Sequence, residues 1–209
     1  TVTATDVDTD NALITFSVSG SELVITSGGV LAFGSAPDYE TKSSYTATVT
    51  ASDGTNSTTQ DIAVTITDVD DTAPVFTSSA TFSAAENQTA IGTVTATDVD
   101  TDNALITFSV SGSELSITSG GVLTFGSTPD YETKSSYTAT VIATDGTNSA
   151  SQDITVTVTN LNDNSPVFTS GETFSAAENQ TTIGTVVATD ADSDILTYSL
   201  SGTDASSIS

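Results

Sequence analysis

A repeat of 92 residues constrains the fold of this chain more than any other feature. The string TVTATD begins at Thr1 and again at Thr93, and TVVATD begins at Thr185, so both offsets are 92 residues. Residues 1–71 and 93–163 are identical at 59 of 71 positions, which indicates recent duplication within a longer array. A period of this length is too long for a solenoid unit and fits an independent domain. The sequence predicts three tandem domains: 1–71, truncated at its N-terminus; 72–163, complete; and 164–209, truncated at its C-terminus.

Short stretches of alternating apolar and polar residues, separated by turn residues, predict an all-β fold. In the complete repeat the predicted strands are 75–84, 91–97, 104–110, 114–118, 122–125, 136–144 and 150–160. Alternation in the last strand predicts that Ile154, Val156 and Val158 face the core. We expect seven-stranded Greek-key β-sandwiches of the immunoglobulin-like kind joined end to end, with Pro74 and Pro166 marking the boundaries.

The composition excludes several classes of function. The chain has 27 acidic residues and two basic ones, giving a net charge of −25, so neither nucleic acid nor an anionic membrane is an expected partner. It has no His and no Cys, which excludes imidazole and thiolate metal sites and leaves Ser and Thr without a base to activate them as nucleophiles. We therefore predict that the protein is not an enzyme. No run of residues is long and apolar enough for membrane insertion in this segment, and an export signal or anchor is expected outside it.

The acidic residues recur in five short blocks per repeat. In the complete repeat these blocks are Glu86, the run DVDTDN at 98–103, DYE at 130–132, DG at 145–146, and the segment before Pro166. A uniformly solvated acidic surface is the alternative interpretation, but it does not explain why the carboxylates fall between strands. Turns of a sandwich gather at its two ends, so blocks far apart in sequence can meet there.

These blocks carry a resemblance to a known family. The string NLNDNSPVF at 160–168 resembles the linker D-x-N-D-N-x-P-x-F between cadherin repeats. AEN at 85–87 resembles the cadherin motif P-E-N, DVD at 98–100 resembles D-x-D, DYE at 130–132 resembles D-R-E, and ATDG at 143–146 resembles A-x-D-x-G. The chain departs from the family pattern at Ala85, at Tyr39 and Tyr131, and at Asp70 and Thr72 of the first linker.

The resemblance implies a cluster of about three Ca²⁺ ions at each junction between repeats. For the first junction it implies ligands from Asp38, Glu40, Val69, Asp70, Asp71, Thr72, Asp98, Asp100, Asn103 and Asp145, with Val69, Thr72 and Asn103 acting through their backbone carbonyls. For the second junction it implies Glu86, Asp130, Glu132, Leu161, Asn162, Asp163, Asn164, Asp190, Asp192 and Asp194, with Leu161, Asn164 and Asp194 acting through carbonyls.

Charge supports calcium independently of the resemblance. The seven carboxylates assigned to the first junction carry a charge of about −7, which bound divalent cations would offset. A mixture of carboxylates and carbonyls without His or Cys favours Ca²⁺ over zinc or copper, and its flexibility favours Ca²⁺ over Mg²⁺. An EF-hand loop starting at Asp98 is a poor fit, because its sixth position is Asn103 where Gly is required and its twelfth is Ser109 where Glu is required.

We therefore predict a calcium-rigidified structural or adhesive repeat, forming a rod or fibre segment of a large surface adhesin or matrix protein. We expect it to be extracellular or at the cell surface, and to come from a bacterium, with a biofilm matrix as one setting. The expected partners are neighbouring repeats of the same chain and identical chains. One alternative is a homophilic module that assembles filaments, and a third is a carbohydrate-binding module that uses Tyr39 and Tyr131.

Overall fold

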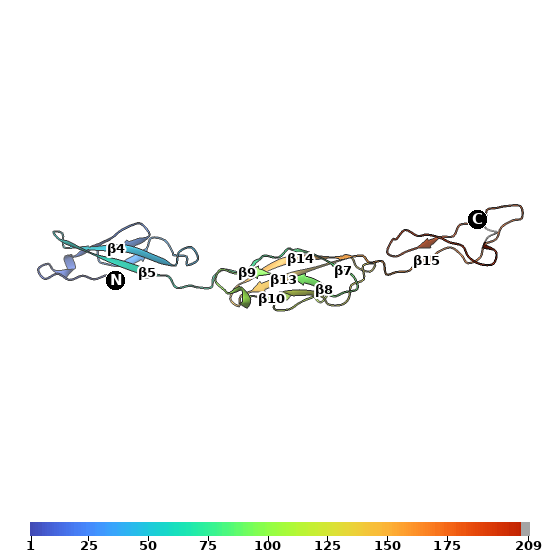
Figure 1. Ribbon diagram of the computed structural model, residues 1–209. Helices are drawn as coiled ribbons and strands as arrows, with labels where there is room; N and C mark the ends of the chain where they lie inside the picture. Colours follow the sequence, from blue (N-terminus) through green and yellow to red (C-terminus); the bar gives the residue numbers. More distant parts are fainter. Residues whose placement is uncertain (206–209) are drawn as a thin grey trace. The chain divides into compact units, whose positions relative to one another are not determined.

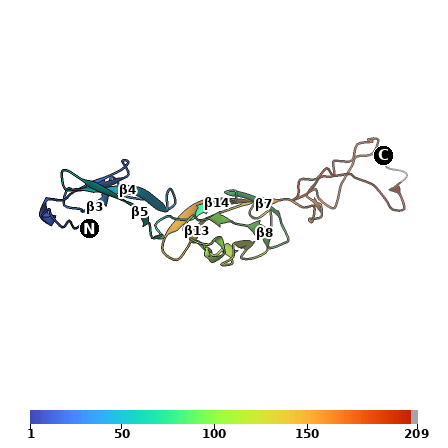
Figure 2. The same cartoon turned by 60° about the vertical axis from the view of Figure 1, so that its left-hand side comes forward.

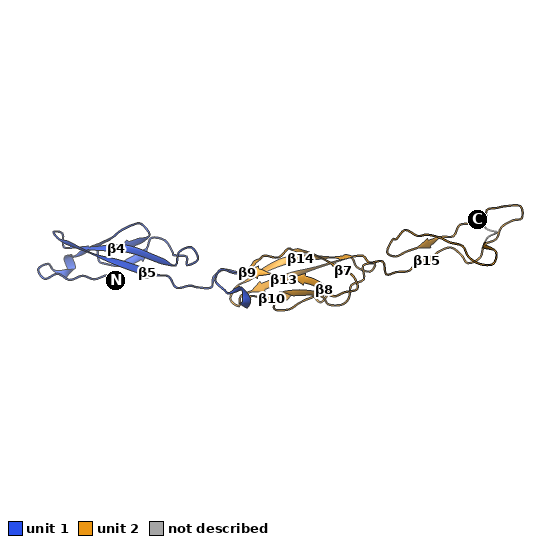
Figure 3. Cartoon of the chain, viewed as in Figure 1, with its two compact units in different colours: residues 1–73, 98–105 blue, residues 74–97, 106–209 orange. Residues whose placement is uncertain are grey.

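The structure is a computed structural model that describes residues 1–205 (Figure 1). The described residues form β-strands and two short 3-10 helices, η1 (Asn11–Leu13) and η2 (Asn103–Leu105), so the prediction of an all-β fold is confirmed. The chain divides into two compact units (Figure 3): unit 1 is Thr1–Ala73 with Asp98–Leu105, and unit 2 is Pro74–Thr97 with Ile106–Ser209. The predicted third repeat, 164–209, includes residues 206–209, which lie outside the described residues.

Unit 2 contains a sandwich built from residues of the predicted complete repeat (Figures 1 and 2). One sheet has the order β10 (Thr107–Val110), β13 (Ser136–Thr144), β14 (Ser149–Thr159) and β7 (Thr81–Ala85). A second sheet has the order β11 (Leu115–Ile117), β12 (Val122–Phe125) and β8 (Ala90–Thr93). The pairs within these sheets are antiparallel except that β7 runs parallel to β14, with Val156 opposite Phe82.

The core of this sandwich follows the alternation in the sequence. Ile154, Val156 and Val158 of β14 are buried as predicted, and they belong to one cluster with Leu123 and Val141 from the facing sheet and the neighbouring strand. Burial of a branched side chain of this size stabilises a fold by about 1.5–3 kcal/mol. This strand therefore anchors the loops at both of its ends.

Three predicted strands were wrong in extent. The stretch 75–84 divides into β6 (Val75–Phe76) and β7, because β6 pairs with β9 (Ala96–Thr97) while β7 pairs with β14. The stretch 91–97 divides into β8, which pairs with β12, and β9, which pairs with β6. The stretch 104–110 begins later than predicted, since η2 occupies its first residues and the Asp102 carboxylate accepts the Ala104 N–H at 3.0 Å.

Unit 1 repeats part of this arrangement. It contains the strands β1 (Thr15–Val18), β2 (Leu23–Ile25), β3 (Leu31–Phe33), β4 (Ser44–Ser52) and β5 (Ser57–Thr65). The sheet order is β1, β4, β5, with β2 and β3 as a separate pair. Ile62, Val64 and Ile66 are half-buried in unit 1, whereas their equivalents 92 residues later are buried. Within the described residues, β5 forms the edge of its sheet.

The C-terminal part of unit 2 has little regular structure. Its two short strands, β15 (Val167–Phe168) and β16 (Ala188–Thr189), pair with each other. Several of its large apolar side chains are exposed, including Phe168, Phe174 and Tyr198. Their equivalents in the complete repeat, Phe76, Phe82 and Phe108, are half-buried against the core cluster.

Candidate metal centres

Three carboxylates meet at the end of β14 in unit 2. Glu86, Glu132 and Asp163 each offer an oxygen atom, and these atoms all lie within 4.8 Å of one another. Glu86 directly follows β7 and is only 2% exposed. Its two oxygens accept the backbone N–H groups of Tyr131 and Leu161, both at 2.7 Å. The parallel pairing of β7 with β14 thus holds Glu86 between the predicted DYE block and the linker.

A second acidic group in unit 2 surrounds Asp192. Carboxylate oxygens of Asp190, Asp192 and Asp194 also lie within 4.8 Å of one another. Asp192 is 8% exposed, and its Oδ2 accepts the N–H groups of Asp163 at 3.0 Å and Asn164 at 2.8 Å. The linker is therefore bonded to the turn that carries the D-x-D motif of the next repeat.

Unit 1 contains the same arrangement around the first linker. Oxygens of Glu40, Asp71 and Asp100 lie within 4.8 Å of one another. Asp100 Oδ2 accepts the N–H groups of Asp71 at 3.2 Å and Thr72 at 2.7 Å, as Asp192 does in unit 2. Asp98 shapes the turn, since its Oδ1 accepts the Asp100 N–H at 2.8 Å and its own N–H donates to Asn103 Oδ1. Two separate units therefore repeat one pattern.

The pKa values of Glu40 and Glu132 in these clusters are raised, whereas that of Asp100 is lowered. A hydrogen bond to its own backbone lowers the pKa of Glu40, but desolvation and the neighbouring Asp100 carboxylate outweigh it and raise the pKa to about 7. Desolvation raises the pKa of Asp100, but bonds donated by Thr72 and Asp71 hold it below its ordinary value. Desolvation and the charges of Glu86 and Asp192 raise the pKa of Glu132.

The donor atoms fit a hard cation. Among the described residues, Asp98 Oδ2 and Asp100 Oδ1 in unit 1 and Asp145 Oδ2 in unit 2 are buried and have no hydrogen-bond partner. A buried carboxylate oxygen without a partner is costly unless a cation binds it. The two lysines of the chain lie elsewhere: Lys42 pairs with Glu22 at 2.6 Å and Lys134 pairs with Glu114. Carboxylate and backbone oxygens alone are the ligands that Ca²⁺ prefers.

Other predicted ligands take different positions. Asp38 and Asp130 each accept bonds from a Thr three residues later, so these carboxylates close turns in this structure. Asp70 has a partner in Thr101, which donates to its Oδ2 at 3.3 Å. Asp145 uses Oδ1 to accept the N–H groups of Thr147 and Asn148. A cavity of about 390 Å³ is lined by Asp38, Glu40, Val69, Asp71 and Thr72, and another of about 260 Å³ is lined by Asn162, Asn164, Asp190 and Asp194.

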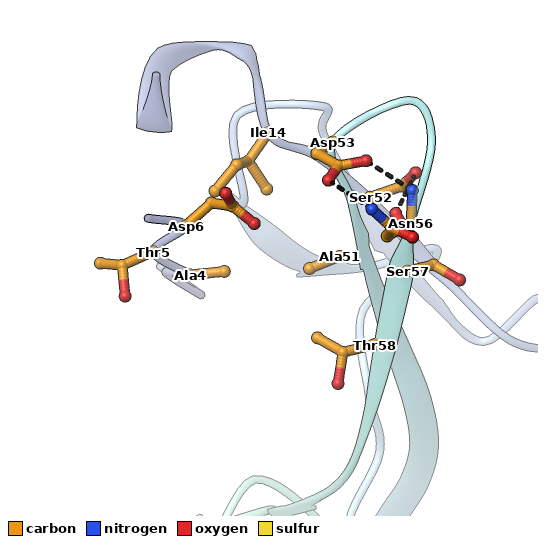
Figure 4. A pocket seen from close by; sticks show the side chains of 10 residues that line it. All are labelled: Ala4, Thr5, Asp6, Ile14, Ala51, Ser52, Asp53, Asn56, Ser57 and Thr58. Atoms are coloured by element: carbon orange, nitrogen blue, oxygen red, sulfur yellow. Dashed lines mark hydrogen bonds between the residues drawn. The ribbon is translucent and has the colours of Figure 1, made fainter. Parts of the chain in front are cut away.

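An acidic cluster near the N-terminus of unit 1 was not predicted from the sequence. Asp6 and Asp53 line one small cavity (Figure 4). A hydrogen bond with Asp6 and the charge of Asp6 raise the pKa of Asp8, with smaller contributions from desolvation and from the charge of Asp53. These residues correspond, 92 positions earlier, to Asp98, Asp100 and Asp145. The repeat period is the sequence signal that identifies these residues.

Comparisons with known proteins agree with this fold. A family model described as "Cadherin domain" matches residues 80–159. The chain is 33% identical over 216 residues, covering 92% of this chain and 7% of the relative, to the mouse (Mus musculus) protein "Cadherin EGF LAG seven-pass G-type receptor 2". Among solved structures it is similar to "Protocadherin Gamma B2 extracellular cadherin domains 3-6", with a TM-score of 0.72, 28% identity, and coverage of 87% of this chain and 53% of that one.

A second solved structure, "Protocadherin gammaB7 EC3-6 cis-dimer structure", has a TM-score of 0.71 at 30% identity and covers 88% of this chain and 53% of that one. The repeated β-sandwich with acidic loops thus defines the class, an adhesion module of cadherin type. The chain belongs to the cadherin repeat family. It spans less than a tenth of the length of the mouse receptor that it matches. Within the described residues, no helix has the length and apolar character needed to cross a bilayer.

Proposed function

We propose that this chain is a segment of an extracellular adhesive protein in which Ca²⁺, about three ions per junction, links consecutive repeats. The observation that carries this proposal is the repeated cluster in which Asp100 or Asp192 accepts two linker N–H groups beside two further carboxylates. These hydrogen bonds orient one oxygen of each carboxylate. The other oxygen of Asp100 is buried without a hydrogen-bond partner, and that of Asp192 accepts only the Asn164 side-chain amide at 3.1 Å. A bound divalent cation removes the repulsion among these carboxylates.

Binding at the linkers gives the repeat a mechanical role. Residues of the linker and of the loops on either side of it would share the same ions, so that metal binding orders a segment that repulsion otherwise loosens. This role supports the proposed rod or fibre segment of a large adhesin or matrix protein at the cell surface. The mouse receptor is an animal protein, and the bacterial origin and biofilm matrix of this chain stay predictions.

A calcium titration tests the proposal directly. Isothermal titration of the chain with Ca²⁺ should give sites that Asp192→Asn weakens by at least about tenfold, because the substitution removes the negative charge and replaces one carboxylate oxygen by an NH₂ donor that cannot bind a cation. Asp153→Asn is the matched control, since Asp153 lies on the outward face of β14, where its carboxylate accepts the Thr140 hydroxyl at 2.7 Å. Equal calcium affinity in the two variants would refute the assignment of Asp192.

Self-association is the second candidate function. The structural neighbour described as a cis-dimer supports it. The carbohydrate-binding alternative has less support, since Tyr39 and Tyr131 are single, half-exposed rings beside the acidic clusters. The carboxylates beside these rings would repel acidic glycans.

A further inference from the structure

The two linkers of this chain differ in their carboxylate and carboxamide side chains. Residues 68–74 have the sequence DVDDTAP, with three carboxylates and no carboxamide, and residues 160–166 have the sequence NLNDNSP, with one carboxylate and three carboxamides. We propose that the carboxamide of Asn164 holds the second linker in its ordered conformation when no cation is bound, whereas the first linker depends on a cation for its order. The two linkers of one chain are then joints of different stiffness at low calcium.

The Asn164 side chain lies among three carboxylates of the second cluster. Its Nδ2 donates to Asp163 Oδ1 at 2.8 Å, to Asp192 Oδ1 at 3.1 Å and to Glu132 Oε2 at 3.3 Å. An amide nitrogen has two hydrogens, so at least one of them is shared between two acceptors. Hydrogen bonds to ionised acceptors are stronger than bonds between neutral groups. This amide therefore places hydrogen-bond donors where the carboxylates would otherwise face only one another.

A second amide fastens the start of the same linker. Asn160 Nδ2 donates to the backbone carbonyl of Asp192 at 3.1 Å. Asp192 Oδ2 in turn accepts the backbone N–H groups of Asp163 and Asn164. Side-chain amides and backbone amides of the second linker thus bind the same turn from both ends of the linker, without any cation.

The first linker has no amide at either position. Asp68 is the equivalent of Asn160, and an ionised carboxylate cannot donate a hydrogen bond. Thr72 is the equivalent of Asn164, and it has one hydroxyl hydrogen, which it donates to Asp71 Oδ1 at 3.4 Å. A bond of this length is weak. The side chains of the first linker therefore contribute little to its order in the metal-free chain.

Negative charge adds to the difference between the linkers. Oxygens of Glu40, Asp71 and Asp100 lie within 4.8 Å of one another, and the first linker supplies no carboxamide to lie between them. Repulsion at this separation favours a loosened linker. The bonds that Asp100 accepts from the linker backbone, at 2.7 and 3.2 Å, are left to oppose that repulsion. We expect the metal-free first linker to open more readily than the second.

Calcium replaces the amide when it binds to the second cluster. The oxygens that accept the Asn164 amide belong to the carboxylates that would bind the cation, so the amide turns away when the ion enters. This step rests on the proposed function, whereas the order of the metal-free linker does not. Asn164 is assigned to calcium through its backbone carbonyl, so a change of its side chain leaves that ligand in place.

Exchanging the residues at this position between the two linkers tests the proposal. The Asp163 N–H donates to Asp192, and its intrinsic exchange rate does not depend on the side chain of residue 164, so its hydrogen exchange reports the order of the second linker. In chelator, Asn164→Thr should lower the protection of the Asp163 amide by about fivefold or more, the factor that one net hydrogen bond supplies. Thr72→Asn should raise the protection of the Asp71 amide by a similar factor.

Ser165→Ala is the matched control, because Ala73 is the equivalent residue of the first linker. Its effect on the protection of the Asp163 amide in chelator should stay within about twofold. Each variant is compared with the unchanged chain at the same linker, since the second linker has a further bond from the Leu161 N–H to Glu86. The β14 amides should exchange equally in all these chains, which shows that the sandwich is folded.

The outcomes separate this proposal from the proposed function. Equal protection of the Asp163 amide in chelator, with and without Asn164→Thr, would overturn the role of the amide. An unchanged Asp71 amide in the Thr72→Asn chain would overturn the account of the first linker. Saturating Ca²⁺ should bring the Asn164→Thr chain to the protection of the unchanged chain. If calcium alters protection in neither chain while the difference in chelator remains, the proposed function fails and the role of Asn164 stands.

Discussion

At the scale of single residues, Asp100 and Asp192 explain why the linkers have the conformation they do. Each uses one carboxylate oxygen to accept two consecutive linker N–H groups, at 2.7–3.2 Å. Charge-assisted bonds of this kind hold the carboxylate in its ionised form. The pKa values of the neighbouring glutamates rise, because desolvation and the nearby like charges both disfavour their ionised form.

The raised pKa of Glu40 predicts a pH dependence in the metal-free chain. The pKa is about 7 in the folded chain, against an ordinary value of 4.5, so the folded chain holds the proton more tightly than the unfolded one. The stabilisation of the folded chain by the proton on Glu40 is complete below about pH 4.5 and is lost as the pH rises through 7. In chelator, the melting temperature of unit 1 should fall between about pH 5 and pH 8, and Glu40→Gln should reduce this fall.

Glu172→Gln is the matched control for that experiment, because Glu172 lies in the C-terminal part of unit 2. A control chain that loses the pH dependence to the same extent as Glu40→Gln would contradict the assignment of the effect to Glu40. Calcium should remove the dependence in the unchanged chain, since a bound cation favours the ionised carboxylate at every pH in this range.

At the scale of elements, the tight turn before β12 depends on one glycine. Gly121 has a φ of 87°, and a Cβ there would lie 2.2 Å from the Val94 carbonyl oxygen, well inside van der Waals contact. Gly121→Ala should therefore destabilise the sandwich by more than about 1 kcal/mol. Gly120→Ala is the matched control, because its Cβ would meet only the Thr118 hydroxyl at 4.0 Å, and its effect should stay within about 0.5 kcal/mol.

Chemical denaturation followed by circular dichroism measures this difference. The paired substitutions change the same atoms in adjacent positions, so a similar loss of stability in both would show that the close approach to Val94 does not limit this turn. Gly29 repeats the arrangement in unit 1, where φ is 82° and an added Cβ would lie 2.2 Å from the Val2 carbonyl oxygen.

Ile62 and Ile154 provide a second comparison between equivalent positions. Ile154 is 1% exposed between β13 and the facing sheet, whereas Ile62 on β5 is half-buried. Ile154→Ala should lower the free energy of unfolding by about 2–5 kcal/mol. Ile62→Ala should lower it by about half as much or less, because water already reaches that side chain. Hydrogen exchange of the β14 and β5 amides separates the two effects. Equal losses would mean that β5 is covered under the conditions of the measurement.

The sequence predicts the inward face of each long strand, because alternation has the same period as the backbone pleat. It does not predict where a strand changes its partner. The polar residues Thr77, Ser78 and Ser79 interrupt the stretch 75–84 where its pairing passes from β9 to β14, but residue types alone do not identify the new partner. The motifs likewise predicted Glu86 and Asp192 as site residues, but which carboxylates accept backbone N–H groups depends on turn geometry that residue types alone do not specify.

At the scale of the whole molecule, one period places the same acidic blocks in each repeat, yet the two clusters share no residue. The cluster of unit 1 contains Glu40, Asp71 and Asp100, and that of unit 2 contains Glu86, Glu132 and Asp163 with Asp192 bonded to the linker. Independent sites with no common partner are expected to contribute additively. The response of this chain to calcium should therefore be the sum of two separable local responses.

This additivity predicts that each linker can lose its calcium response alone. Ca²⁺ at about 100 times the dissociation constant should stabilise each linker by about 2.7 kcal/mol through preferential binding to its ordered state. Asp100→Asn should remove the calcium-induced protection from hydrogen exchange at residues 66–74 and leave that at 159–167, while Asp192→Asn should do the reverse. The sandwich amides of β13 and β14 should stay protected in both variants, because neither carboxylate packs in their core. Loss of protection at both linkers from one substitution would mean that the clusters are coupled, and that calcium acts on the chain as a single cooperative element.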